Sequence, residues 1–140
     1  MARARRLAAT GLCLGAAALG TCVALADRLS ARDLSLELAR RLGPSDEVWT
    51  YGTYLHGIPF YLGRPVARVI NWVGELHYAQ RDPAHASRFG DDDEIRALPL
   101  KGRRVFVVLR RWEAGYFLTL AGPGEVRWQA EFGPWMVVEF

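Results

Sequence analysis

Val105-Phe106-Val107-Val108-Leu109 is a continuous apolar run, and Arg104 and Arg110 enclose it. Successive side chains of a β-strand point to opposite faces of the sheet. An unbroken apolar run is therefore typical of a strand that is buried on both faces. On this basis we predict a strand over residues 104–110, in the middle of a sheet.

Two more strands are predicted before this one. Residues 47–51 are mostly β-branched and aromatic, and residues 66–73 are apolar on most of both faces. Helical segments over 53–62 and 91–98 separate the strands, with a shorter helical turn over 83–89. Strands that alternate with helices favour right-handed β-α-β crossovers and a parallel sheet.

A hairpin is predicted to close the chain. A helix over 112–121 ends at Gly122-Pro123-Gly124, and strands over 126–132 and 135–140 flank Gly133-Pro134. The hairpin adds antiparallel strands at one edge of the sheet. The predicted fold class is therefore α/β, with one N-terminal transmembrane helix followed by a small layered mixed sheet of about five strands, flanked by helices and closed by the hairpin.

The N-terminal region predicts a membrane anchor. Residues 7–26 form an uncharged stretch of 20 residues, and as a helix they would be about 30 Å long, which matches the hydrocarbon core of a bilayer. Three arginines precede this stretch and Asp27 follows it. By the positive-inside rule, we predict a single-pass protein of the cell (inner) membrane. Residues 1–26 are its transmembrane helix, the N-terminus is cytoplasmic, and the soluble domain is periplasmic or extracellular.

Other interpretations of this segment stay open. Ala24-Leu25-Ala26 resembles a signal peptidase site, and Leu19-Gly20-Thr21-Cys22 resembles a lipoprotein site in which Thr21 replaces a smaller residue. The uncharged stretch exceeds the roughly 7–15 residues of a signal-peptide core, which favours a retained helix. Gly11 and Gly15 would let a neighbouring membrane helix approach closely, and the alternative is an Ala- and Gly-rich segment without a partner.

A short amphipathic helix is predicted next. Ser30 caps it, Gly43-Pro44 ends it, and its leucines share one face. That face suits either a membrane surface or the soluble domain. We assign residues 27–44 as a juxtamembrane amphipathic helix and residues 45–140 as the extracytoplasmic α/β domain.

The distribution of charged residues and cysteines argues against a nucleic-acid-binding protein and against a disulfide-stabilised domain. Three of the 18 Lys and Arg residues precede the membrane segment, and the remaining fifteen balance the 15 Asp and Glu residues. A domain without net charge does not attract a nucleic-acid backbone, so we predict no nucleic-acid partner. Cys13 and Cys22 both lie within residues 7–26, so we expect no disulfide in the soluble domain.

The candidate metal ligands have simpler explanations. Asp91 and Asp93 form an Asp-x-Asp pair of the kind that binds divalent cations, which would suit an enzyme acting alone. Four acids in the first turn of a helix also complement its dipole and cap its free N–H groups, and we favour this interpretation. His56, His77 and His85 match no zinc-binding spacing. We predict no catalytic residue, no metal site and no cofactor.

One aromatic cluster is a candidate interaction surface. It consists of Tyr51, Tyr54, Phe60 and Tyr61 together with Arg64. Aromatic residues also dominate the cores of small domains, so packing of a short helix on the sheet is the alternative interpretation.

Three segments carry a resemblance to a known family: residues 48–54 (VWTYGTY), 58–65 (IPFYLGRP) and 74–76 (GEL). With them the chain resembles the C-terminal soluble domain of glycosyltransferase family 39, which includes the aminoarabinose-lipid A transferases and enzymes related to protein mannosyltransferases. The resemblance implies a polytopic membrane enzyme that takes a sugar from a polyprenyl phosphate carrier. Residues 7–26 occupy the place of its last membrane helix. Glu75 belongs to the matched pattern and joins the candidate interaction surface.

The family's catalytic acid lies near its N-terminus, in an extracytoplasmic loop that has no counterpart in this chain, so no catalytic residue is carried over. The resemblance implies a membrane-anchored terminal domain that is not catalytic alone and works with a polytopic membrane region, as a fragment, a split-gene product or a free-standing relative. The helices of that region would pack on the Gly11 and Gly15 face. The alternative is an independent secreted or membrane-anchored binding module.

Overall fold

The computed structural model describes residues 20–21, 30–72, 74–98 and 102–140. The chain divides into two compact units, Met1–Ser30 and Ala31–Phe140. The predicted transmembrane helix, including Gly11 and Gly15, lies outside the described residues apart from positions 20 and 21. Within the described ranges, no helix has both the length and the apolar character that a membrane span requires. The membrane anchor therefore stays a prediction.

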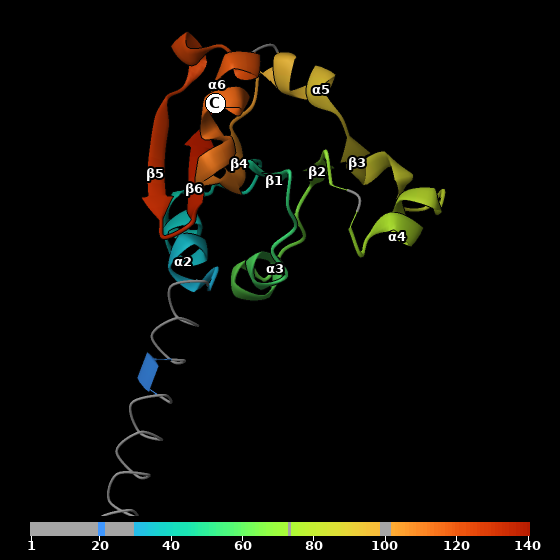
Figure 1. The fold of residues 1–140 in the computed structure, drawn as a ribbon, viewed down its shortest axis with the longest axis horizontal. Helices are drawn as coiled ribbons and strands as arrows, with labels where there is room; N and C mark the ends of the chain where they lie inside the picture. Colours follow the sequence, from blue (N-terminus) through green and yellow to red (C-terminus); the bar gives the residue numbers. More distant parts are fainter. Residues whose placement is uncertain (1–19, 22–29, 73, 99–101) are drawn as a thin grey trace, which may run out of the picture. The chain divides into compact units, whose positions relative to one another are not determined.

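The second unit is built on one mixed six-stranded sheet with the order β3-β2-β1-β4-β6-β5, which Figure 1 shows across the molecule. Strands β3, β2, β1 and β4 are parallel, and β6 runs antiparallel to both β4 and β5. The strands are β1 (Glu47–Tyr51), β2 (Arg68–Ile70), β3 (Phe89–Gly90), β4 (Val105–Arg110), β5 (Trp128–Phe132) and β6 (Trp135–Glu139). The predicted parallel core and closing hairpin are confirmed.

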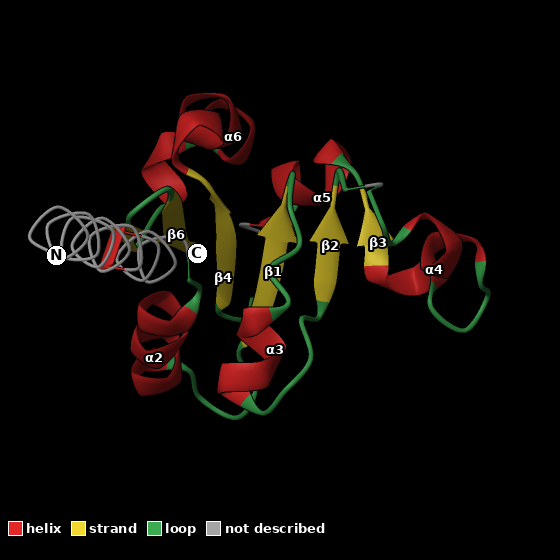
Figure 2. Cartoon of the chain, turned by 60° about the horizontal axis from the view of Figure 1, so that its bottom comes forward, coloured by secondary structure: helices red, strands yellow, loops and turns green. Residues whose placement is uncertain are grey.

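Helices cover both faces of this sheet, so the unit has three layers (Figure 2). On one face, α2 and α3 contribute Leu34, Leu38 and Ile58 to the core. On the other face, α5 and α6 contribute Ile95 and Phe117. The helices of this unit are α2 (Arg32–Arg41), α3 (Gly57–Leu62), α4 (His77–Arg81), α5 (Asp92–Arg96) and α6 (Ala114–Ala121).

Strand β4 is central, as predicted. All residues from Val105 to Leu109 are fully buried. Val105, Val107 and Leu109 face α5 and α6, whereas Phe106 and Val108 face α2 and α3. The two-residue periodicity of a strand thus gives both layers a share of the same apolar run.

Helix α2 packs against the sheet of its own domain. Leu34 and Leu38 are buried beside Val48 of β1. Beside this apolar face, Glu37 pairs with Arg40 and Arg41 at 3.3 Å and 2.8 Å. The apolar face of this helix suited either a membrane surface or the soluble domain, and in the structure it packs against the domain. A juxtamembrane position for residues 27–44 stays a prediction.

Arg104, the residue before β4, forms ion pairs with two nearly buried carboxylates. Arg104 Nη1 lies 3.3 Å from Asp46 Oδ2, and Arg104 Nη2 lies 3.0 Å from Glu139 Oε1. Asp46 Oδ2 also accepts a hydrogen bond of 2.8 Å from the Gly43 N–H. Arg104 therefore connects the α2–β1 loop to β6.

Several predicted elements differ from the observed ones. The sheet has six strands where about five were expected, because residues 83–89 give a 3₁₀ turn at Ala86–Arg88 followed by the two-residue strand β3. The helix predicted over 53–62 begins only at Gly57, since Pro59 lacks an N–H and is tolerated only in a first turn. Helix α4 was not predicted.

Candidate functional site

The carboxyl ends of β1 and β4 border a hollow of about 510 Å³. The chain leaves β1 toward α3 on one face of the sheet and leaves β4 toward α6 on the other face. In open α/β sheets, ligands bind at such a switch point, outside the carboxyl ends of the strands. We call this hollow the β1–β4 crevice, and its lining residues are Tyr51, Gly52, Asn71, Trp72, Trp112, Glu113 and Tyr116.

Asp92, at the start of α5, joins three of the elements around the crevice. Its Oδ1 accepts hydrogen bonds from Tyr51 Oη at 2.9 Å and from Asn71 Nδ2 at 2.5 Å. Its Oδ2 accepts one from Tyr116 Oη at 3.0 Å. One carboxylate thus holds together the end of β1, the residue after β2, and helix α6.

The two tyrosines at Asp92 are held in their protonated form. Burial, and then the hydrogen bond to Asp92, raise the pKa of Tyr51 to about 12. The hydrogen bond to Asp92 also raises the pKa of Tyr116. Loss of either proton would place a phenolate beside a carboxylate, which is why the pKa values rise, and both hydroxyls donate to Asp92.

The backbone bends sharply at two crevice residues. Asn71 has a φ of 53°, and it alone among the described residues other than glycine has a positive φ. This left-handed conformation ends β2 at Ile70, three residues before the predicted end of the strand at 73. Gly52 has a φ of 61°, and a Cβ there would lie 2.5 Å from Glu113 Oε1. The absence of a side chain at Gly52 therefore lets the Glu113 carboxyl approach the end of β1.

Glu113 is the carboxyl group with the most unusual environment in the crevice. Burial raises its pKa, and contacts with Arg110 offset part of that effect. Within the described part of the chain, Glu113 Oε2 is buried without a hydrogen-bond partner. The fold therefore favours the neutral form of this side chain.

Glu113→Gln is expected to make the domain more stable than the wild type at pH 7 and equally stable near pH 4. A carboxyl group whose pKa is raised by folding contributes stability below its unfolded pKa, and this contribution is lost as the pH rises through the folded pKa. Thermal unfolding of both proteins between about pH 4 and pH 8 measures the difference.

Glu125→Gln, which alters an exposed carboxylate, is the matched control and should change stability by less than about 0.5 kcal/mol at pH 7. A Glu113→Gln effect of constant size across this pH range would contradict a raised pKa.

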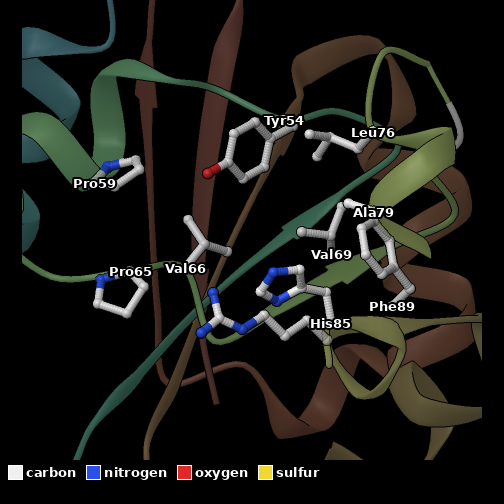
Figure 3. A pocket seen from close by; sticks show the side chains of 10 residues that line it. Tyr54, Pro59, Pro65, Val66, Val69, Leu76, Ala79, His85 and Phe89 are labelled. Atoms are coloured by element: carbon white, nitrogen blue, oxygen red, sulfur yellow. The ribbon is translucent and has the colours of Figure 1, made fainter. Parts of the chain in front are cut away.

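A second, smaller hollow of about 210 Å³ lies among α3, β2 and α4. Most of its lining is apolar, and Figure 3 shows Tyr54, Val66 and His85 around it. The lining residues are Tyr54, Pro59, Pro65, Val66, Val69, Leu76, Ala79, His85, Arg88 and Phe89.

Comparison with solved structures identifies the fold. Crystal structures of ArnT from Cupriavidus metallidurans, one bound to undecaprenyl phosphate and one in the apo state, each match with a TM-score of 0.62. The domain has the fold of one part of ArnT. Sequence identity is 23% and 22%, over 80% of this chain. The chain covers 20% of ArnT, so it spans about a fifth of that protein's length.

The resemblance inferred from the sequence is thus confirmed at the level of the fold. No family model matches the sequence, and no curated protein matches it.

The structure places the residues of the candidate interaction surface on both sides of the ArnT-like sheet. Tyr51 is buried and packs edge-on against Phe117, with 5.1 Å between ring centroids. Tyr54 lines the hollow of Figure 3 on the opposite face. Phe60 is 80% exposed on α3 and contacts the ring of Tyr61. Tyr51 is therefore separated from the other aromatic residues by the sheet.

The two charged members of that set have separate partners. Arg64 donates hydrogen bonds to the carbonyl oxygens of Gly43 and Asp46, so it holds the α2–β1 loop. Glu75 lies 2.8 Å from His56 Nε2, and the hydrogen bond between them lowers the pKa of Glu75. The ring of His56 is also in edge contact with that of Tyr54. Tyr54 and Glu75 are thus linked through His56.

The acidic run at residues 91–94 begins helix α5. Asp91 is the N-cap residue, and its Oδ1 accepts a hydrogen bond of 3.0 Å from the Asp93 N–H. Asp93 pairs with Arg96. Across the described ranges, no three His, Cys, Asp or Glu side chains gather closely enough to hold a metal ion.

The crevice residues other than Tyr51 were not predicted. Asn71 lies inside the predicted strand over 66–73, and Asp92 was interpreted only as part of an acidic first helical turn. Trp112, Glu113 and Tyr116 belonged to a predicted helix. The sequence nevertheless held a usable signal. Polar and aromatic residues stand at or just after the ends of three predicted parallel strands, and the carboxyl ends of parallel strands lie at the same edge of a sheet.

Proposed function

We propose that this chain is the membrane-anchored, extracytoplasmic C-terminal domain of a polyprenyl-phosphate-sugar-dependent glycosyltransferase, and that it is not catalytic alone. The observation that carries the proposal is the likeness of fold to ArnT, which was crystallised with undecaprenyl phosphate. The uncharged residues 7–26 supply the anchor, with the N-terminus in the cytoplasm and the α/β domain in the periplasm.

The Asp92 carboxylate supports a role that depends on a partner. A carboxylate that acts as a general base must have an oxygen within hydrogen-bond reach of the proton that it takes. Both oxygens of Asp92 accept hydrogen bonds from the protein itself, and both of its tyrosine partners are held protonated. The proposed partner is a polytopic membrane region whose helices contact the Gly11 and Gly15 face.

Membrane fractionation with protease treatment tests this proposal. We expect the full 140-residue chain in the membrane fraction, and we expect protease added to spheroplasts to digest the α/β domain. Mass spectrometry should find an N-terminus ahead of residue 7, since the helix is retained. The purified chain should not consume an undecaprenyl-phosphate-linked sugar.

Three results would contradict the proposal. They are a chain in the cytosolic fraction, a mature N-terminus at Asp27, and turnover of the sugar donor by the purified chain.

A second candidate function is an independent binding module. The β1–β4 crevice favours it, because a hollow of this size at a switch point is a ligand site in many α/β domains. Such a module would bind its ligand without any membrane partner.

A further inference from the structure

Two aromatic rings beside the β1–β4 crevice are exposed to solvent. Trp112 is 74% exposed and Tyr116 is 59% exposed. They are four residues apart in consecutive helical turns, so their side chains lie on the same side of that segment. Large aromatic residues with exposed faces beside a hollow are common in binding sites, because each offers a rigid apolar surface at a small cost in side-chain entropy.

The polar groups of the crevice are suited to neutral hydroxyl groups. Its lining includes an amide at Asn71 and a carboxyl at Glu113, with the Asp92 carboxylate hydrogen-bonded to the wall. None of the lining residues that the structure describes is a Lys or an Arg. The Asp92 carboxylate at the wall, with no cation among the described lining residues, disfavours phosphate and carboxylate ligands.

Two hydrogen-bonding groups at the crevice wall lack partners among the described residues. They are the donor Trp72 Nε1 and the acceptor Glu113 Oε2, and both atoms are buried. An unpartnered polar group in a buried position costs free energy. A hydroxyl group is both a donor and an acceptor of hydrogen bonds. After a small shift of the wall on ligand binding, the hydroxyl groups of one ligand could accept from Trp72 Nε1 and donate to Glu113 Oε2.

We infer that the β1–β4 crevice binds an uncharged sugar unit of a glycan, with the sugar ring against Trp112 and hydroxyl groups directed at Asn71 and Glu113. A sugar ring combines an apolar C–H face with peripheral hydroxyls, which is the combination that the aromatic and polar parts of the crevice complement. The hollow of about 510 Å³ is within the range of small-molecule sites. This binding goes beyond the proposed function and needs neither the membrane anchor nor the polytopic partner.

Ligand titration of the full 140-residue chain tests the inference. The protein is kept in a detergent without a sugar head group, so that the detergent does not compete. The probes are methyl glucoside, methyl mannoside, methyl galactoside and N-acetylglucosamine, followed through the tryptophan indole N–H signals in NMR spectra. We expect saturable shifts with at least one of them, and a dissociation constant of about 1 mM. Glucuronate and glucose 6-phosphate should bind at least about ten times more weakly.

Variants at the exposed aromatic residues localise the site. Trp112→Ala should weaken binding at least about tenfold, and Trp112→Phe, which keeps a ring, should retain most of the affinity. Phe60→Ala removes an equally exposed ring on α3, away from the crevice, and should bind like the wild type. Because Trp112 is exposed, its loss should leave the circular dichroism spectrum unchanged.

Absence of saturable shifts with every neutral probe up to about 10 mM would overturn the inference. So would wild-type affinity in the Trp112→Ala protein, or binding of glucuronate as tight as that of the glucoside. These results would leave the proposed membrane topology and the need for a partner unaffected, and failure of those proposals would leave sugar binding unaffected.

Discussion

Phe106→Ala is expected to lower the free energy of unfolding by about 3–5 kcal/mol. Phe106 lies in the central strand β4, between β1 and β6, and is fully buried. It belongs to the core cluster that also holds Leu34 and Leu38 of α2. Truncation removes the burial of the ring and leaves a cavity where the sheet meets its helical layer, and a strand held on both sides cannot move to fill it.

Thermal or urea unfolding measures this loss. For a domain of this size, the melting temperature should fall by about 12–20 °C. Phe60→Ala is the matched control, because it removes the same atoms from a side chain that is 80% exposed, and it should change stability by less than about 0.5 kcal/mol. A Phe106→Ala protein within about 1 kcal/mol of the wild type would show that β4 is not the centre of the core.

Arg104→Ala is expected to lower the free energy of unfolding by about 3 kcal/mol. Arg104 lies within ion-pair distance of two carboxylates whose side chains are only 7% and 10% exposed, those of Asp46 and Glu139. Without the Arg104 cation, two negative charges remain in nearly buried positions with no positive charge beside them. The repulsion between the two carboxylates is then no longer offset. The guanidinium also lies 5.2 Å from the centre of the Phe106 ring. We place the effect at the lower end of the range for buried pairs because Arg104 itself is partly exposed.

The neighbouring residue provides the control for this variant. Among the described residues, Arg103 pairs only with Glu47, and Arg103 is half exposed. Arg103→Ala should therefore lower the free energy of unfolding by less than about 1 kcal/mol in the same assay. Arg104→Lys keeps the charge but loses the two-pronged geometry, so it should fall between the wild type and Arg104→Ala. Equal effects of Arg103→Ala and Arg104→Ala would mean that burial of Asp46 and Glu139 does not decide the cost.

The main strands could be predicted because burial patterns along the chain are local signals. Residues 47–51 match β1, and the apolar run from Val105 matches β4. The hairpin around Gly133-Pro134 is likewise observed. In each case consecutive residues determine which element forms. A run that is apolar on both faces predicts a buried strand, and turn residues between two strands predict a hairpin.

The remaining differences arise from contacts between distant parts of the chain. Strand β3 has only two residues, and its pairing with β2 defines it rather than any pattern in Phe89-Gly90. The crevice depends on Asp92 reaching residues that are 41, 21 and 24 positions away. No local pattern specifies such distances. The topology does so, by bringing the ends of parallel strands to one edge.

The sheet order also governs when the parts of this domain can assemble. β1 is synthesised early, yet its neighbour β4 follows only after residues 52–104, so the central ladder forms by closing a long loop. In contrast, β4, β5 and β6 lie within residues 105–139 and pair antiparallel. A ribosome or an export channel therefore releases β1, with its apolar side chains and its unpaired backbone edge, well before the strand β4 that will pair with that edge. During that interval, nascent chains are most exposed to aggregation and have the most need of a chaperone.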